Sequence, residues 1–346
     1  KEELKSLAVE GWDEFEGNTP HRPWIDKIKI KHPESGLMGT RIPDVGNPWL
    51  DAGVVPFSTM KYEKDEKYWE EWFPADWISE SFPGQYRNWF YSLLTMSVVL
   101  AGKEPCKSIF SYALMRDEHG EEMHKSKGTA IDFGEAAEKM GVDAMRWVFV
   151  LHNPSQNLNF GFTTADEVRR RFLLTLWNTY SFFVTYANID HFDPITAKDI
   201  VPSSEMDRWV LSELHSLIED VTSSLDNYDA AGAGHRIEDF TELLSNWYVR
   251  RNRRRFWKSE NDHDKLSAHT TLYSCLVTLT KLLAPLTPFI SEELYQNLVR
   301  SANPDVPESV HLTNYPVPDS AQICLLYTSD AADEGLGVDL GGRRII

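Results

Sequence analysis

The residues whose types and spacing best suit chemistry lie in one loop, residues 123–128, which reads Met-His-Lys-Ser-Lys-Gly. A helical pattern begins soon after it, at Phe133. Lysine ammonium groups act as point charges, hydroxyl and backbone N–H groups donate hydrogen bonds, and glycine permits close approach. The loop is therefore predicted to bind a polyphosphate and to neutralise charge during phosphoryl or nucleotidyl transfer. A solvated turn between a strand and a helix is the open alternative.

A second group of residues could bind a polyanion. Within one helical stretch, residues 245–257, five arginines fall within six positions and alternate with aromatic residues. Such arginines repel one another unless an anion or an acid is near. Each can fork to a phosphate, and the aromatic rings can anchor the helix or stack on bases. Pairing with acidic residues of neighbouring helices is the alternative. The candidate residues are Trp247, Arg250, Arg251, Arg253, Arg254 and Arg255.

Two stretches beside the loop carry a resemblance. Residues 74–92 read Pro-Ala-Asp-Trp-Ile-Ser-Glu-Ser-Phe-Pro-Gly-Gln-Tyr-Arg-Asn-Trp-Phe-Tyr-Ser, and residues 141–147 read Gly-Val-Asp-Ala-Met-Arg-Trp. In order, spacing and amino-acid sequence, these stretches resemble the second half of the nucleotide-binding domain of class I aminoacyl-tRNA synthetases, specifically the isoleucine–tRNA ligase family. The resemblance runs from about residue 1 to residue 321.

The resemblance implies a role for the loop. In that family a Lys-Met-Ser-Lys-Ser signature stabilises the pyrophosphate end of ATP while the amino acid is adenylated. Here the second lysine of the signature is Lys125, whereas Glu122 replaces the first lysine and His124 the first serine. The implied catalytic residues are Lys125, Ser126 and Lys127, and Met123, His124 and Lys125 are implied to contact ATP.

Other family segments imply contacts with the adenylate. Trp49, Asp51 and Gly53 match three positions of a Trp-Phe-Asp-Ser-Gly segment. The resemblance also assigns Glu80, with a one-residue insertion, and Gln85 to the adenylate pocket. Judged from its spacing alone, Asp51 is instead expected to be a turn-capping carboxylate.

The arginine stretch resembles the Trp-Tyr-x-Arg-Arg helix in the anticodon-binding bundle of isoleucine and valine ligases, which makes tRNA the implied partner. The implied substrates are isoleucine, tRNA(Ile), and ATP with Mg²⁺. In some related synthetases a turn within an insertion of the catalytic domain carries paired cysteines, whereas the turn here reads His-Pro-Glu-Ser-Gly, residues 32–36. Because this turn has no cysteine, we expect no zinc or other metal site.

Composition narrows the class of protein. The chain has 346 residues, with 35 basic and 53 acidic side chains and a net charge of −18, so RNA contacts must come from local basic clusters. Its three cysteines have no Cys-x-x-Cys spacing, which fits a reducing compartment. No apolar run reaches the roughly 18 residues of a membrane span. We expect a cytoplasmic monomer without a membrane partner.

The pattern of elements predicts an α/β part followed by an all-α part. Expected strands are residues 25–31, 77–80 and 108–115, and residues 42–53 read as a tight path between strands. Expected helices of the first part cover residues 61–73 and 88–100, with one starting at Asp132. A capping box is expected at residues 164–167. Helices then follow at residues 207–225, 230–258, 266–283 and 291–300. The expected fold is the second half of a Rossmann-type catalytic domain, followed by an antiparallel helical anticodon-binding bundle.

Four segments are expected along the chain. They are an insertion remnant (1–40), the second half of the catalytic domain (41–162), the anticodon-binding domain (163–323) and a non-native tail that resembles translated sequencing adapter (324–346). The chain begins with Lys1 and lacks the His-Ile-Gly-His signature of the family's amino-side half. We therefore expect a carboxyl-side fragment that is inactive alone. The alternatives are a valine–tRNA ligase fragment and a non-catalytic tRNA-binding paralogue.

Overall fold

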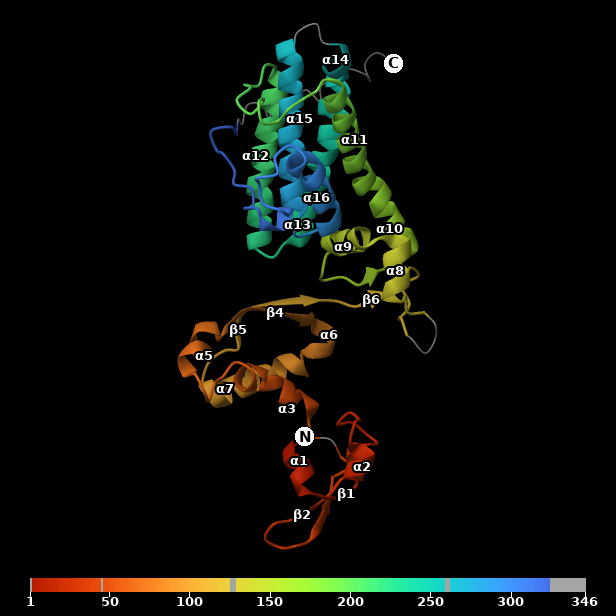
Figure 1. The fold of residues 1–346 in the computed structure, drawn as a ribbon, viewed down its shortest axis with the longest axis vertical. Coiled ribbons are helices and arrows are strands. Elements are labelled where there is room, and N and C mark those ends of the chain that lie inside the picture. Colours follow the sequence, from red (N-terminus) through yellow and green to blue (C-terminus); the bar gives the residue numbers. More distant parts are fainter. Residues whose placement is uncertain (1, 45, 125–128, 259–261, 324–346) are drawn as a thin grey trace. The chain divides into compact units, whose positions relative to one another are not determined.

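The computed structural model describes residues 2–44, 46–124, 129–258 and 262–323. Its internal contacts divide the chain into two compact units, Lys1–Phe110 and Ser111–Ile346 (Figure 1). The first unit contains short helices and two small sheets, and the second is dominated by long helices. None of the helices in the described ranges is long and apolar enough to cross a lipid bilayer.

The first unit opens with a three-stranded antiparallel sheet in the order β1-β2-β3. Its strands are Ala8–Glu10, Lys29–Lys31 and Met38–Thr40, and helices α1 (Glu2–Leu7) and α2 (Trp12–Phe15) flank β1. The strand predicted at residues 25–31 was wrong in its first half. Ile25–Lys27 form a 3₁₀ turn, and the adjacent ion pair between Arg22 Nε and Asp26 Oδ2, 2.7 Å apart, favours a helical turn.

The predicted tight path at residues 42–53 was also wrong, because its end is a helix, α3 (Pro48–Gly53). The side chain of Asn47 accepts a hydrogen bond from the backbone N–H of Trp49 at 3.0 Å, and Pro48 occupies the first turn, where its missing N–H costs nothing. Gly53 permits close packing on helix α7 (Trp89–Ala101), since a Cβ there would lie 2.7 Å from the carbonyl oxygen of Ser92.

Strands β4 (Ala75–Ser81) and β5 (Cys106–Tyr112) form a two-stranded sheet. Between them lie α6 (Phe82–Gln85) and α7, as the strand and helix predictions at residues 77–80 and 88–100 required. Helix α5 (Glu66–Trp72) covers the second half of the helix predicted at residues 61–73. It packs with α4 (Val55–Ser58) through a small aromatic core of Phe57, Trp69 and Phe73.

The second unit begins with a parallel strand pair, β6 (Met115–Arg116) and β7 (Leu158–Asn159). Helices α8 (Phe133–Met140) and α9 (Val142–Leu151) connect them, and Asp132 caps α8 as predicted by accepting from the backbone of Gly134 at 2.9 Å. The capping box predicted at residues 164–167 was wrong, because α10 (Phe162–Val168) begins earlier. The carboxylate of Glu118 accepts the backbone N–H of Thr163 and so takes over the role of the cap.

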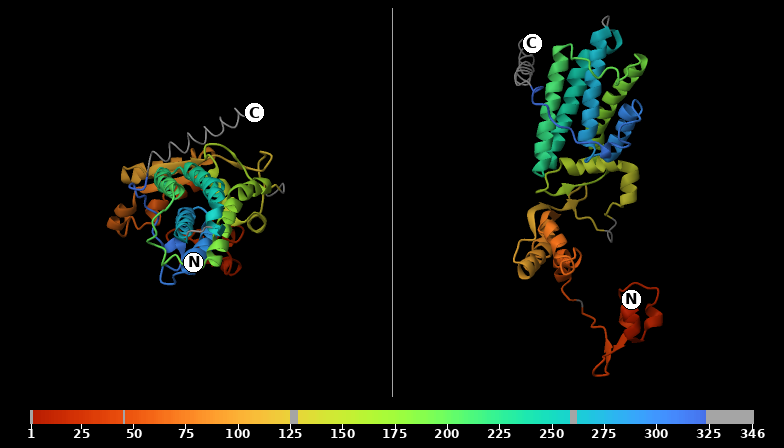
Figure 2. Two further views of the ribbon diagram at one scale, coloured as in Figure 1. Left: turned by 90° about the horizontal axis from the view of Figure 1, so that it is seen from above. Right: turned by 60° about the vertical axis from the view of Figure 1, so that its left-hand side comes forward.

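A helical bundle forms the rest of the second unit (Figure 1, Figure 2). Successive long helices run in opposite directions, and they bury one apolar core. Within the described part of residues 163–300 no strand interrupts them, which confirms the predicted change from α/β to all-α. The elements are η3 (Arg169–Leu173), α11 (Leu174–Ile189), α12 (Glu205–Asp226), α13 (Ala230–Leu243), η4 (Leu244–Val249), α14 (Arg250–Lys258), α15 (Asp262–Leu283), α16 (Pro288–Tyr295), η5 (Gln296–Arg300) and η6 (Val310–Leu312).

Candidate functional site

The lysine loop is described only at its two stems, since Lys125, Ser126 and Lys127 lie outside the described residues. Thr129 joins the stems. Its hydroxyl oxygen accepts from the backbone N–H of His124 at 2.9 Å and lies 3.3 Å from the carbonyl oxygen of Glu122, to which it donates. Met123, between them, is half-buried. These hydrogen bonds thus hold the two stems of the loop together.

The two positions that depart from the family signature lie against each other. The Nε2 atom of His124 is 3.1 Å from a carboxylate oxygen of Glu122. A carboxylate repels the phosphates of ATP, so the substitution of Glu122 for lysine opposes the loop's implied task. The neighbouring imidazole offsets that charge when it is protonated.

The adenylate candidates on α3 have different surroundings. Trp49 is half-buried, whereas Asp51 is exposed in the first turn of the helix. Because Asn47 provides the cap, Asp51 does not serve as the capping carboxylate that its spacing suggested. Within the described chain no hydrogen bond or ion pair involves its carboxylate, which leaves Asp51 able to meet a ligand.

The other two candidates lie where β4 passes into α6. An oxygen of the half-buried Glu80 accepts from the backbone N–H of Ser81 at 2.8 Å. The amide oxygen of Gln85 accepts the backbone N–H of Trp89 at 3.1 Å, which satisfies the free end of α7 and fixes the Gln85 side chain. All four adenylate candidates belong to the first unit, whereas Met123 and His124 belong to the second.

Four of the five arginines are exposed, and so is Trp247. Trp247, Arg250, Arg251 and Arg254 follow the spacing of one helix face. The Arg251 guanidinium lies over the Trp247 ring, 4.2 Å from its centroid, a cation–π contact. Among the residues that the structure describes, no acid pairs with Arg250, Arg251, Arg253 or Arg254. Trp247, Arg250, Arg251 and Arg254, together with Arg253, form what we call the arginine face.

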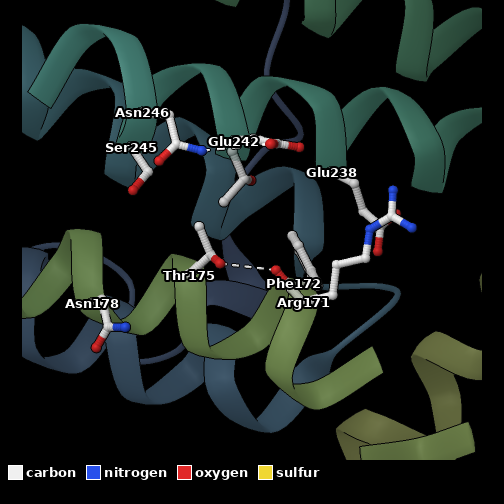
Figure 3. Close-up of a pocket in the computed structure, with 9 residues that line it drawn as sticks. Arg171, Phe172, Thr175, Asn178, Glu238, Glu242, Ser245 and Asn246 are labelled. Atoms are coloured by element: carbon white, nitrogen blue, oxygen red, sulfur yellow. Dashed lines mark hydrogen bonds between the residues drawn. The ribbon is translucent and has the colours of Figure 1, made fainter. Parts of the chain in front are cut away.

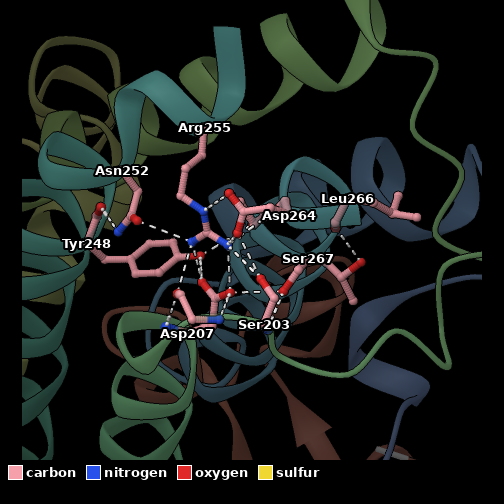
Figure 4. Close-up of polar contacts among 11 residues, drawn as sticks. Ser203, Asp207, Tyr248, Asn252, Arg255, Asp264, Leu266 and Ser267 are labelled. Atoms are coloured by element: carbon pink, nitrogen blue, oxygen red, sulfur yellow. Dashed lines mark hydrogen bonds and ion pairs between the residues drawn. The ribbon is translucent and has the colours of Figure 1, made fainter. Parts of the chain in front are cut away.

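Arg255 differs, because its guanidinium is bound inside the bundle (Figure 4). It forms ion pairs of 2.7 Å with Asp207 of α12 and with Asp264 of α15, and only 14 % of its side chain is exposed. Here the alternative, pairing with acids of neighbouring helices, is confirmed. The prediction that Arg255 contacts tRNA is therefore withdrawn, since its donors are already used.

Further polar groups complete this network around Asp207. The Tyr248 hydroxyl donates to Asp207 at 2.7 Å, and the Ser267 hydroxyl donates at 2.9 Å. Burial by itself would raise the pKa of Asp207, but the hydrogen bonds from Arg255, Tyr248 and Ser267 outweigh it and lower the pKa. Burial beside this carboxylate also raises the pKa of Tyr248. The network therefore holds a charged carboxylate and a neutral phenol.

Comparisons with known proteins decide the family. Residues 4–161 match the family model "tRNA synthetases class I (I, L, M and V)", and residues 207–335 match "Anticodon-binding domain of tRNA ligase". The isoleucine–tRNA ligase of Dehalococcoides mccartyi is 48% identical over 308 residues, which are 88% of this chain and 30% of that protein. The enzyme of that name from Thermus thermophilus is 43% identical over 324 residues, 92% of this chain and 31% of that protein.

This chain belongs to the class I aminoacyl-tRNA synthetases. The expected order of a synthetase catalytic domain followed by an anticodon-binding domain is confirmed by the two matched segments. The chain spans about 30% of the length of the curated relatives it matches.

Two solved synthetases share the fold. LeuRS of Agrobacterium radiobacter K84, solved in a ternary complex with tRNA and LeuAMS, aligns with a TM-score of 0.62 at 19% identity, covering 87% of this chain and 36% of its own. The methionyl-tRNA synthetase of Mycobacterium tuberculosis, solved with methionyl-adenylate, aligns with a TM-score of 0.61 at 18% identity, covering 83% and 60%. At these identities the likeness concerns the fold alone.

Residues of the synthetase motif at 141–147 join the loop-bearing part of the second unit to the bundle, a role that sequence reasoning missed. Asp143 accepts the backbone N–H of Ile290 at 2.6 Å, and Arg146 donates to the carbonyl oxygens of Pro285 and Leu286 at 2.8 Å each. The buried indole of Trp147 donates to Glu238 at 3.0 Å. The family motif was the available signal, but its partners are more than ninety positions away.

Proposed function

We propose that this chain is part of an isoleucine–tRNA ligase, which adenylates isoleucine with ATP and transfers it to the terminal ribose of tRNA(Ile). The observation that carries the proposal is the identity of 43–48% over most of this chain to two enzymes of that name. Valine–tRNA ligase, the nearest alternative, has no comparable support among these relatives.

The proposed chemistry divides between the two units. Lys125 would hold the polyphosphate as charge develops on the leaving pyrophosphate, with Ser126 and Lys127 donating beside it. Met123 and His124 would border the ATP. Trp49, Asp51, Glu80 and Gln85 would contact the adenylate. A carboxylate of Asp51 or Glu80 would accept hydrogen bonds from the amine or the ribose of the adenylate, and the side-chain amide of Gln85 would hydrogen-bond to its polar edge.

Magnesium enters the proposal as part of the ATP substrate. Across the described ranges, no group of three or more His, Cys, Asp and Glu side chains could hold a metal ion. Mg²⁺ typically keeps several waters and binds through substrate phosphates, so a cage built wholly by the protein is not required.

The arginine face is the proposed tRNA contact. Its exposed guanidiniums suit phosphate, and Trp247 offers an aromatic surface for a base or ribose. Arg255 would act indirectly, by fixing α14 against α12 and α15. A chain with an overall charge of −18 needs such a local cluster to bind RNA.

The test is ATP–pyrophosphate exchange by the protein encoded by the completed gene, with isoleucine and valine compared side by side. We expect a preference for isoleucine of about 150-fold, the discrimination that such pockets achieve for one methylene. Lys125→Ala should abolish exchange while tRNA binding persists. Residues 1–346 alone should show no exchange. If they did catalyse exchange, the part of the relatives that this chain does not cover would not be needed for adenylation.

The contact between Glu122 and His124 favours a second candidate, a tRNA-binding protein whose loop no longer catalyses. A folded, completed protein that binds tRNA(Ile) but exchanges neither amino acid would establish that alternative. In that case Lys125→Ala would change neither activity nor binding.

A further inference from the structure

The stem that leads into the lysine loop is acidic. Residues 116–124 contain one arginine and four carboxylates, and the carboxylates are Asp117, Glu118, Glu121 and Glu122. Like charges repel, so these carboxylates oppose the approach of a polyphosphate to the stem. How each of them is neutralised therefore decides how well the loop can bind ATP.

The fold uses the charged groups at the start of the stem. Asp117 and Glu118 accept backbone N–H groups, from the turn and from α10 respectively. Arg116, on β6, forms a β-bridge with Glu122, but its Nη1 atom donates to a carbonyl oxygen of the turn at 2.9 Å. Within the described ranges no ion pair joins Arg116 to Glu122. The permanent positive charge of the stem thus does not neutralise Glu122.

Glu122 has a histidine as its partner. The Nε2 atom of His124 lies 3.1 Å from the Glu122 carboxylate, and both side chains are partly exposed to solvent. The Thr129 hydroxyl contacts the backbone of both residues, which holds the pair at the start of the loop. Of the charged groups that the structure describes, only Glu122 lies within ion-pair distance of His124. The other histidine of the stem, His119, is exposed at the turn.

Carboxylates of the bundle have partners that do not depend on pH in this way. Glu238, which lines the polar pocket between α11 and α13 (Figure 3), accepts from the indole of Trp147 at 3.0 Å. Asp207 is paired with the guanidinium of Arg255. An indole N–H and a guanidinium keep their protons throughout the neutral range, whereas the charge of a histidine ordinarily changes between pH 5 and 8.

The two protonation states of His124 present different groups to a phosphate. An ionised carboxylate only accepts hydrogen bonds, so the Nε2 atom that faces Glu122 carries a proton. In the neutral imidazole, Nδ1 is then a lone-pair acceptor, and the pair has a net charge of one negative unit. In the imidazolium, Nδ1–H is a donor and the pair is neutral. No described residue bonds to Nδ1, so this donor is open to a phosphate oxygen.

We propose that the Glu122–His124 pair makes ATP binding by this loop proton-dependent, with the imidazolium form of His124 as the form that binds. Protonation cancels the charge of Glu122 and adds a charge-assisted donor, and both changes favour a polyphosphate. The lysine that the family signature has at the position of Glu122 would keep its charge across the neutral range. The inference rests on the proposed function, since it assumes that the loop binds ATP.

The test measures the binding of Mg-ATP, without amino acid, to the protein encoded by the completed gene. Calorimetry at pH 8, 7 and 6 should show an affinity that rises by about three- to tenfold as the pH falls. At pH 7, binding should take up protons, which titrations in two buffers with different heats of ionisation detect. ATP itself titrates in this range, so the comparison is with His124→Ser, which restores the signature serine. This variant should show a smaller rise in affinity and less proton uptake.

Two further variants separate the pair from the general charge of the stem. Glu121→Gln removes the neighbouring exposed carboxylate, which does not pair with His124 among the described residues, and should keep the wild-type dependence on pH. Glu122→Lys restores the signature lysine and should bind ATP at pH 8 more tightly than wild type does. In ATP–pyrophosphate exchange, the pH dependence of wild type should appear mainly in the KM for ATP and not in kcat.

The outcomes distinguish this inference from the proposed function. Equal pH dependence and equal proton uptake in wild type and His124→Ser, with exchange intact, would overturn the role of the pair and leave the ligase proposal standing. Proton-linked ATP binding that needs His124, without exchange of either amino acid, would support the pair and overturn the ligase activity. Absence of ATP binding at all three pH values would overturn both.

Discussion

Arg253 and Arg255 lie two positions apart on α14, and their environments are opposite. Arg253 is exposed, and no acid among the described residues pairs with it, whereas Arg255 pairs with Asp207 and Asp264 and is 14 % exposed. The residue type is the same, so the direction of each side chain around the helix decides its role. One arginine is part of the bundle's interior, and the other remains available to an anion.

The two kinds of arginine depend on each other. Asp207 comes from α12 and Asp264 from α15, so Arg255 joins α14 to two other helices. Tyr248, fully buried and about two helical turns before Arg255, adds a further hydrogen bond to Asp207. These contacts fix the rotation of α14 about its axis. That rotation is what turns the arginine face toward solvent.

The largest expected effect comes from Arg255→Met. The change leaves the Asp207 carboxylate, whose side chain is 0% exposed, buried without its cation. Breaking a buried pair in this way typically costs about 3–5 kcal/mol of the free energy of unfolding. Urea denaturation followed by circular dichroism measures it. The matched variant Arg253→Met should stay within about 0.5 kcal/mol of wild type, and equal losses from both would remove the distinction between them.

Low pH should diminish the difference in the free energy of unfolding between wild type and Arg255→Met. Hydrogen bonds from Arg255 oppose the effect of burial and keep the pKa of Asp207 and that of Asp264 below their usual values. A carboxyl group with a depressed pKa stabilises the fold above its unfolded-state value, about 3.9, and loses that contribution as pH falls through the folded-state pKa. Wild type should therefore lose stability below about pH 4, and Arg255→Met, which lacks these pairs, should lose less.

Urea midpoints at pH 7, 5 and 3.5 would measure the effect of acid. The difference in urea midpoint between wild type and Arg255→Met should be constant between pH 7 and pH 5 and should narrow at pH 3.5. A difference that widened at low pH would show that the ion pairs of Arg255 do not account for the stability lost in Arg255→Met.

Sequence predicted the elements of this molecule better than their contacts. Helical spacing and the resemblance to the family's sequence motifs located the bundle helices and the arginine stretch, because those signals are local. Asp207 was read only as the start of a helix. Its network is assembled from α12, α14 and α15, which meet only in the folded chain, so no local pattern announces it.

The errors were of the same kind. Ile25–Lys27 alternate like a strand, but the ion pair of Arg22 with Asp26 favours a turn. The capping box expected at residues 164–167 was placed inside a helix, because a carboxylate from Glu118, distant in sequence, caps that helix. The capping box that the bundle does contain lies at Ser204 and Asp207. In each case a tertiary or i,i+4 contact outweighed the local pattern.

Trp247→Ala tests the aromatic part of the arginine face. Stacking of a base on an aromatic side chain contributes about 1–3 kcal/mol, so the dissociation constant for tRNA should rise by about 5- to 150-fold. The ring also supports the Arg251 guanidinium. Because Trp247 is uncharged, the salt dependence of binding should change little. Trp247→Phe, which keeps a smaller ring, should fall between wild type and Trp247→Ala in a titration with labelled tRNA.

The smallest effect on tRNA affinity is expected from Arg254→Gln. This variant tests directly whether Arg254 contacts a phosphate. Each lost phosphate contact should lower the slope of log K against log salt by about 0.7–0.9. Titrations between 50 and 200 mM salt would measure it. Lys198→Gln removes an exposed charge outside α14 and should leave the slope unchanged. Equal slopes for Arg254→Gln and wild type would mean that this arginine, although exposed, makes no phosphate contact, and that exposure alone does not separate it from Arg255.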